Sequence, residues 1–137
     1  MIKHFRPILF VVGIILMSLA SCQDKSTALC RSWKIENLKY TKKIPDLMQS
    51  TIQRSIDEMK KSFVLTYTPD GTFITTLNGK QTLHGTWTLN FNSSKITALT
   101  ETGQTVNYPI VELNPSSFKF KAVENGQEVI FEMIPVN

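Results

Sequence analysis

Three short runs of β-branched and aromatic residues occupy residues 62–90, and two tight-turn signals separate them. The first signal is Pro69-Asp70-Gly71. The second is Asn78-Gly79, a dipeptide that favours the two-residue turn of a β-hairpin. Further turn signals recur to the C-terminus, at Asn92-Ser93-Ser94, Thr102-Gly103, Asn114-Pro115-Ser116 and Asn125-Gly126. Short connections of this kind join antiparallel strands, so the pattern predicts a β-meander.

The turns divide the chain after residue 61 into predicted strands near residues 62–68, 72–78, 82–91, 95–101, 104–113, 117–124 and 127–134. An earlier strand covers residues 31–40, where Trp33, Ile35 and Leu38 are the apolar anchors. Eight antiparallel strands in sequence order can close into an up-and-down barrel or pack as two sheets. Local connections throughout favour the barrel.

Residues 45–61 interrupt the strand pattern. Apolar residues recur there at the spacing of one helix face, namely Met48, Ile52, Ile56 and Met59. Asp46 suits the start of a helix, and Lys60-Lys61 suit its negative end. We therefore predict an all-β fold, an eight-stranded antiparallel up-and-down barrel with one amphipathic helix, Asp46–Lys61, between the first and second strands.

The last hairpin specifies its own register. A two-residue turn at Asn125-Gly126 opposes Phe118 with Met133, Phe120 with Phe131, Ala122 with Val129 and, on the other face, Lys119 with Glu132. Continuing through the preceding turn places Val111 and Leu113 on the same apolar face as Phe120.

Two strands need a change of parity. Val106, Tyr108 and Ile110 alternate out of step with Leu113, which predicts a bulge or kink at Pro109. Counting back from the Asn78-Gly79 turn aligns Leu83 with Ile74 and leaves Trp87 off the face of Phe73. Gly85 is the predicted position of the compensating bulge.

The N-terminus has the layout of a secretory signal. Lys3 and Arg6 precede an apolar run from Ile8 to Leu19, too short to span a bilayer that requires about 20 helical residues. The quartet Leu19-Ala20-Ser21-Cys22 resembles the lipobox of bacterial lipoproteins. This resemblance implies cleavage before Cys22 and acylation of Cys22 by fatty acids such as palmitate. The alternative is an ordinary signal peptide, with Cys22 left as a thiol.

The resulting domain plan is a lipoprotein signal peptide at 1–21, a lipidated tether at 22–29 and a barrel at 30–137. The resemblance implies a lipid-anchored protein of the bacterial cell envelope, and Gln23 after the cysteine points to the outer membrane. The formal net charge of +4 includes Lys3 and Arg6, which the mature chain lacks. The remaining charge gives no argument for a nucleic-acid partner.

The mature chain resembles the lipocalin-like lipoproteins of Gram-negative bacteria. The resemblance rests on Trp33 in the first strand, on Phe63 with Pro69-Asp70-Gly71-Thr72-Phe73, on Gly85-Thr86-Trp87-Thr88-Leu89, and on Tyr108, Ile110, Leu113, Phe118 and Phe120. Arg31 stands where lipocalins usually have glycine. The resemblance implies a barrel that binds a small apolar ligand. The helix has the topological position of the lid of fatty-acid-binding proteins.

We name as candidate ligand-lining residues Trp33, Met48, Ile52, Ile56, Phe63, Leu65, Tyr67, Phe73, Trp87, Tyr108, Phe118, Phe120 and Phe131. Trp33 and Trp87 have an alternative role as core aromatics at a closed end of the barrel. Two functions follow from the same residues. Either the barrel holds a ligand under a helical lid, or large side chains fill it and it binds a protein or glycan partner through its outer face.

Catalytic patterns are scarce in the mature chain. His84 is its single histidine and lies mid-strand, and Asp57 and Glu58 are adjacent on a helix and diverge. No cofactor motif or metal-ligand spacing occurs. We therefore expect no enzyme activity, no cofactor and no metal. Cys30 is left as an odd cysteine, either buried or available for an intermolecular disulfide.

Overall fold

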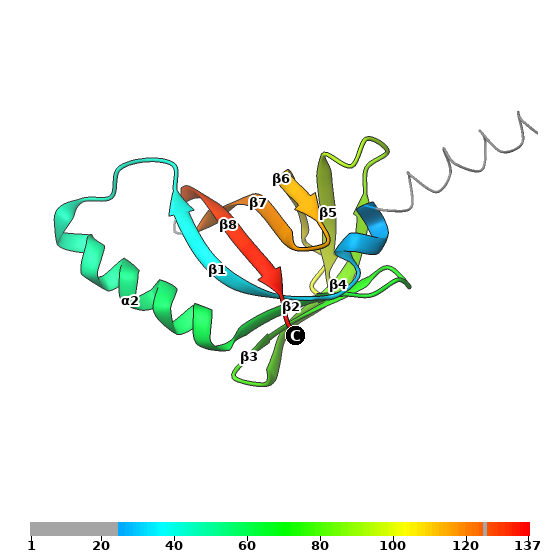
Figure 1. Ribbon diagram of the computed structural model, residues 1–137, viewed down its shortest axis with the longest axis horizontal. Helices are drawn as coiled ribbons and strands as arrows, with labels where there is room; N and C mark the ends of the chain where they lie inside the picture. The colour runs from blue at the N-terminus through cyan, green and yellow to red at the C-terminus, as the bar shows by residue number, and fades with distance from the viewer. Residues whose placement is uncertain (1–24, 125) are drawn as a thin grey trace, which may run out of the picture.

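A computed structural model describes residues 25–124 and 126–137 of this chain. Its strands form one closed antiparallel barrel in sequence order (Figure 1). The strands are β1 Ser32–Tyr40, β2 Phe63–Tyr67, β3 Thr72–Leu77, β4 Lys80–Leu89, β5 Lys95–Thr100, β6 Thr105–Asn114, β7 Ser117–Glu124 and β8 Gln127–Pro135. Helix α2, Asp46–Ser62, connects β1 to β2. The predicted fold class is confirmed, and each predicted strand is found within about two residues of its expected limits.

Helix α2 begins directly after Pro45, which has an extended backbone. Asp46 lies in its first turn and Lys60 and Lys61 in its last, so both charges favour the helix dipole as predicted. Ile56 is the buried residue of this helix, whereas Met48 is 50% exposed and Leu47 95% exposed. The helix therefore packs along part of its length, and its N-terminal end extends away from the barrel (Figure 1).

The Asn78-Gly79 turn joins β3 to β4 as predicted, with Leu77 opposite Lys80. Asn78 and Gly79 have φ angles of 54° and 77°, the left-handed values that a type I′ hairpin turn requires. The predicted bulge at Gly85 is wrong, because Thr75 pairs with Leu83 whereas Thr76 pairs with Gln81, leaving Thr82 as the extra residue. Ile74 consequently lies opposite His84 and not Leu83.

Gly85 has a different role, which is to let two strands approach. A Cβ atom at this position would lie 2.0 Å from the carbonyl oxygen of Leu99 on β5 and 2.9 Å from the Phe73 ring on β3. Only glycine fits there without displacing backbone.

The parity change in β6 occurs at Val111, two residues after the predicted position at Pro109. Ile110 pairs with Phe120 and Glu112 pairs with Lys119, so Val111 is the unpaired residue. Val111 is 49% exposed whereas Leu113 is 7% exposed. The prediction that Val111 shares the apolar face is therefore wrong, because the bulge turns its side chain outward.

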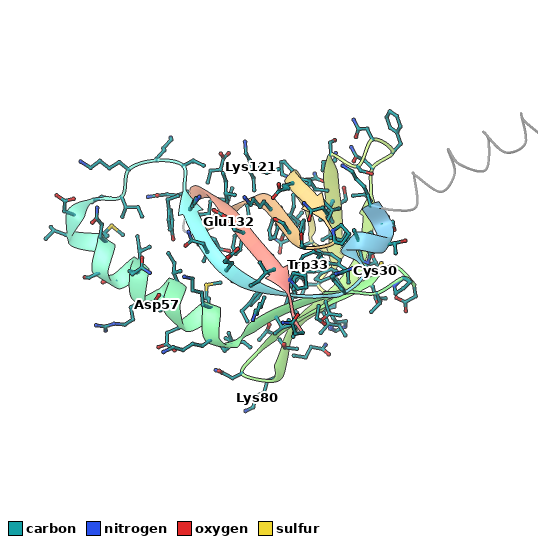
Figure 2. The ribbon with its side chains drawn as sticks, in the orientation of Figure 1. Cys30, Trp33, Asp57, Lys80, Lys121 and Glu132 are labelled. Carbon is teal, nitrogen blue, oxygen red and sulfur yellow. The ribbon has the colours of Figure 1, made fainter. Side chains whose placement is uncertain are left out.

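The predicted register of the last hairpin is confirmed. Phe118 pairs with Met133, Phe120 with Phe131, Ala122 with Val129 and Lys119 with Glu132. Asn125 of its turn lies outside the described residues. On the outer face, Glu132 lies 2.8 Å from the Lys39 ammonium and 3.8 Å from that of Lys119 (Figure 2). Both lysine ammonium groups remain accessible to solvent, so these ion pairs contribute little to stability.

Aromatic side chains fill one end of the barrel, which we call the closed end. Trp33 is fully buried there and its ring centroid lies 5.4 Å from that of Phe118 (Figure 2). The Trp33 indole donates a hydrogen bond to the carbonyl of Leu29, and the Arg31 guanidinium lies 5.6 Å from the ring centroid. Trp87 is also buried and donates to the carbonyl of Thr68. The tryptophans are thus core residues of this end.

The folded body begins before residue 30. Residues 25–29 are helical, Ala28 and Leu29 are buried, and Leu29 accepts the hydrogen bond from Trp33. The predicted tether at 22–29 is therefore too long at its C-terminal end, because these apolar side chains cover the closed end. The predicted signal peptide at 1–21 and Cys22 lie outside the described residues.

Two seams of the barrel wall are short. β1 pairs with β2 only through Ser32, Trp33 and Lys34, since α2 then separates the two strands. β6 pairs with β7 only from Ile110 to Asn114, which leaves residues 105–109 without a partner on that side. The C-terminal end of the chain contacts the start of β1 at the closed end, where the amide of Val136 donates to the carbonyl of Ser32.

Candidate functional site: a cavity in the open half of the barrel

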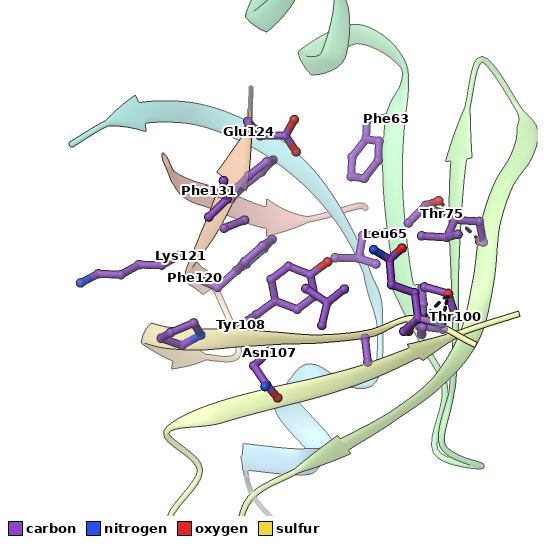
Figure 3. A pocket seen from close by; sticks show the side chains of 18 of the residues that line it. Phe63, Leu65, Thr75, Thr100, Asn107, Tyr108, Phe120, Lys121, Glu124 and Phe131 are labelled. Atoms are coloured by element: carbon purple, nitrogen blue, oxygen red, sulfur yellow. Dashed lines mark hydrogen bonds between the residues drawn. The ribbon is translucent and has the colours of Figure 1, made fainter. Parts of the chain in front are cut away.

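The half of the barrel opposite the closed end contains a cavity of about 710 Å³ (Figure 3). This volume lies within the range of about 300–1,000 Å³ that small-molecule sites usually have. Its lining residues are Met59, Phe63, Leu65, Tyr67, Phe73, Thr75, Thr82, Leu83, Ala98, Thr100, Gln104, Val106, Asn107, Tyr108, Pro109, Phe120, Lys121, Ala122, Val123, Glu124, Glu128 and Phe131.

One wall of the cavity is aromatic. Phe120 and Phe131 stack almost in parallel, with centroids 5.0 Å apart, and Tyr108 meets Phe120 edge-on at 5.4 Å. Phe63 and Leu65 of β2 lie across the cavity from this stack (Figure 3). The register of the β7–β8 hairpin places Phe120 and Phe131 directly opposite each other, so the stack follows from the sequence. The wall is preformed and offers apolar contact to a ligand.

The opposite wall carries small and hydroxylated side chains. Thr75 and Thr100 are buried, and their hydroxyl groups have protein partners. Thr75 Oγ1 lies 2.8 Å from Thr82 Oγ1, and Thr100 Oγ1 lies 2.9 Å from Thr102 Oγ1. Together with Ala98 these threonines take little space. This wall therefore leaves the room that large side chains would have occupied.

Tyr67 lies at the floor of the cavity. Its ring lines the cavity and also packs edge-on against Trp87 at 5.5 Å and Phe118 at 6.1 Å, both residues of the closed end. Burial raises the pKa of Tyr67, and the neighbouring Tyr108 raises it further. Burial also raises the pKa of Tyr108, with a smaller effect from Glu124. Both phenols are accordingly neutral at physiological pH.

The cavity opens through the wall between β6 and β7 as well as at the end of the barrel. Asn107 and Pro109 on β6 and Lys121 and Val123 on β7 line it, although they alternate with the inward residues of their strands. The pairing of these two strands stops at Ile110 and Phe120, so a gap follows. Pro109 suits this position because it has no amide hydrogen to pair.

Charged groups are confined to the rim. Glu124 and Glu128 are the carboxylates that line the cavity, and Lys121 is its one cationic side chain among the described residues. Figure 3 shows Lys121 directed away from the cavity, whereas the Glu124 carboxylate lies at its mouth. The interior is thus uncharged, and the rim has an acidic character.

The structure brings part of the predicted ligand-lining set together. Those lining the cavity are Phe63, Leu65, Tyr67, Phe73, Tyr108, Phe120 and Phe131. Those elsewhere are Trp33, Trp87 and Phe118 in the closed end, and Met48, Ile52 and Ile56 on α2. The closed-end residues do not line the cavity, because they are buried in the aromatic packing below Tyr67.

The predicted helical lid is placed differently. Ile52 and Ile56 line a second groove together with Leu38 and Tyr40 of β1, Ile56 belongs to the buried core, and Met48 is half exposed. Of the helix, only Met59 lines the cavity. The stripe therefore joins the helix to β1, and α2 borders the cavity with its last turn.

Sequence reasoning missed the small residues of the cavity, chiefly Thr75, Thr82, Ala98 and Thr100. Three of them have a parity signal, since Thr75 follows Phe73 by two positions and Ala98 and Thr100 follow Ile96 at the same spacing, all of them buried. They were not predicted because the candidate set contained only large apolar and aromatic side chains.

Other reactive groups lie outside the cavity. His84 is exposed on β4, with its Nδ1 atom 2.9 Å from Glu101. Cys30 is half-buried, and burial followed by the charge of Asp70 raises the pKa of its thiol. Within residues 25–124 and 126–137, no group of three or more potential ligands is placed to hold a metal ion. Nor is any helix of this part long and apolar enough to cross a membrane.

Comparison with known proteins gives a structural relative. No family model matches the sequence, and no curated protein matches it either. Among solved structures, a lipocalin-like protein from Bacteroides uniformis ATCC 8492 is similar with a TM-score of 0.51 and 13% sequence identity. The match covers 80% of this chain and 99% of that one. At this identity the likeness concerns the fold, and the barrel with a helix between β1 and β2 is a lipocalin-like fold.

Proposed function

We propose that this protein is a non-enzymatic carrier or sensor of a small, largely apolar ligand, held in the barrel and tied to the bacterial cell envelope through lipidated Cys22. The observation that supports ligand binding is the cavity of about 710 Å³, lined by Phe63, Phe120 and Phe131. A barrel that acts only through its outer face has no need for such a space, and cavities in a well-packed core cost stability.

The cavity also favours this proposal over the filled-barrel alternative. The large inward side chains are divided between the two ends. Trp33, Trp87 and Phe118 pack in the closed end, and small residues such as Ala98 and Thr100 face the stacked phenylalanines in the other. The envelope location rests on the resemblance of Leu19-Ala20-Ser21-Cys22 to a lipobox, in a segment outside the described residues.

Binding of the uncharged fluorescent probe N-phenyl-1-naphthylamine to the mature domain tests the proposal. We expect saturable binding with a stoichiometry near one, because the cavity is preformed and apolar. Ala122→Trp fills the cavity from β7 and should abolish binding. Leu99→Trp, on an exposed position of β5 that does not line the cavity, should leave it unchanged. Absence of saturable binding to the wild-type domain would refute the carrier proposal.

A further inference from the structure

The floor of the cavity contains a buried polar group without a protein partner. Tyr67 is 5% exposed and lines the cavity. Its hydroxyl has no hydrogen-bond partner among the described residues. In this part of the chain, the side-chain atoms that are both fully enclosed and without a partner are Arg31 Nε and Gln127 Oε1. The Tyr67 hydroxyl is not among them, so it keeps some accessible surface. Because Tyr67 lines the cavity, we take this surface to face the cavity, where the hydroxyl can donate and accept a hydrogen bond.

A second phenol faces the same space. Tyr108 extends from β6 into the cavity with its hydroxyl toward Leu65 (Figure 3). Its hydroxyl likewise has no partner among the described residues, and the two phenols are close enough for Tyr108 to influence the ionisation of Tyr67. The threonine hydroxyls of the opposite wall differ, because Thr75 and Thr100 are already hydrogen-bonded within the protein. The two tyrosine hydroxyls thus remain available to a ligand, as does the side-chain amide of Gln104, which also lines the cavity.

The charges around the cavity exclude an anionic ligand group from this position. No cationic side chain of the described residues points into the cavity, and Glu124 and Glu128 stand at its rim. A carboxylate at the floor would lose its hydration without gaining a counter-ion, which costs several kcal/mol. An ammonium group bound at the acidic rim would not reach the tyrosines. At the floor it would find hydrogen-bond acceptors but no negative charge to pair with.

From these observations we propose that the cavity binds an uncharged amphiphile, an apolar chain or ring system bearing a hydroxyl or carbonyl group that hydrogen-bonds to Tyr67 and Tyr108. The apolar part lies along the Phe120–Phe131 stack. The proposal rests on the carrier function above and adds the chemical class of the ligand, and it predicts discrimination against free fatty acids.

Three ligands of equal chain length test the assignment by displacing N-phenyl-1-naphthylamine at pH 7.5, namely decanol, decanoate and decylamine. Decanol should compete at least about tenfold more strongly than decanoate, because burying the charged carboxylate without a counter-ion costs far more than burying a hydroxyl group that gains a hydrogen bond. Tyr67→Phe should weaken decanol about fivefold, the loss of one buried hydrogen bond, once the competition is corrected for the variant's own affinity for the probe. Tyr40→Phe, on β1 outside the cavity, is the matched control and should have no effect.

The outcomes separate the two proposals. Equal competition by decanol and decanoate, or stronger competition by decanoate, overturns the assignment while the carrier function stands. Stronger competition by decylamine than by decanol also overturns the assignment, and it indicates that Glu124 and Glu128 recognise the ligand. A decanol preference that survives Tyr67→Phe and Tyr108→Phe shows that the phenols do not provide it. Failure of the probe itself to bind the wild-type domain overturns both proposals.

Discussion

At the scale of single residues, close packing between strands gives the sharpest constraint. Gly85→Ala places a methyl group 2.0 Å from the Leu99 carbonyl oxygen, so β4 and β5 must separate. We expect a loss of unfolding free energy of about 3 kcal/mol or more, measured by urea denaturation. Gly103→Ala is the control. Its φ of +83° strains an alanine, but no atom lies within 4 Å of the added methyl, and about 1 kcal/mol should be lost.

Asp70 makes the stability of the fold depend on pH. Hydrogen bonds from the side chains of Thr68 and Thr72, and from the amide of Thr72, hold the pKa of Asp70 below its ordinary value. A carboxyl group whose folded pKa is lowered stabilises the fold above its unfolded pKa and loses that contribution as pH falls through the folded value. Urea midpoints of the wild type should therefore decline below about pH 4. Asp70→Asn should decline less over the same interval, and parallel profiles would contradict this reading.

At the scale of elements, helix α2 is joined to the barrel by its middle and last turns. Ile56 is 6% exposed in the groove against β1, whereas Leu47 is 95% exposed. Ile56→Asp should destabilise the domain by about 3 kcal/mol because it buries an unpaired charge. Leu47→Asp, at the exposed end of the same helix, should change stability by less than about 0.5 kcal/mol. Thermal and urea unfolding measure both, and equal effects would contradict the observed packing.

The strands and the last hairpin could be predicted because alternation and turn residues are local signals. Phe118, Phe120 and Ala122 alternate on β7, and a two-residue turn leaves one register in which they meet Phe131. The bulges could not be located in this way. Pro109 and Gly85 are unusual residues in a strand, yet the unpaired residues are Val111 and Thr82. Which residue a strand leaves unpaired depends on the neighbouring strand, which the local sequence does not describe.

The cavity was predictable in part for a similar reason. Side chains such as Phe63, Phe120 and Tyr108 were assigned to the interior by parity, and they line the cavity. Whether an inward side chain belongs to the packed end or to the cavity depends on its position along the barrel axis, which parity does not give. Trp33 and Phe118 lie near the start of their strands at the closed end, and small residues such as Ala98 determine where space remains.

At the scale of the whole molecule, the proposed attachment to the envelope would depend on a single residue, Cys22. Cys22→Ser should prevent acylation and release the protein from the membrane fraction, because the thiol is the acceptor in the lipobox that residues 19–22 resemble. Cys30→Ser is the matched control, since Cys30 belongs to the folded domain. Labelling with a radioactive or clickable palmitate analogue, followed by fractionation, measures both. Unchanged labelling of the Cys22 variant would contradict the proposed anchor.

The N-terminal helix at residues 25–29 and the C-terminal end both contact β1 at the closed end, which bears on how a tethered barrel would be oriented. Val136 bonds to Ser32, and residues 25–29 cover Trp33 on the same side. If the protein is anchored through Cys22 as proposed, its aromatic base would lie toward the point of attachment and the cavity would face outward, where a ligand would exchange with the surrounding medium or with an approaching partner. A reporter fused to the C-terminus joins the molecule at the base as well, and it leaves the entrance free.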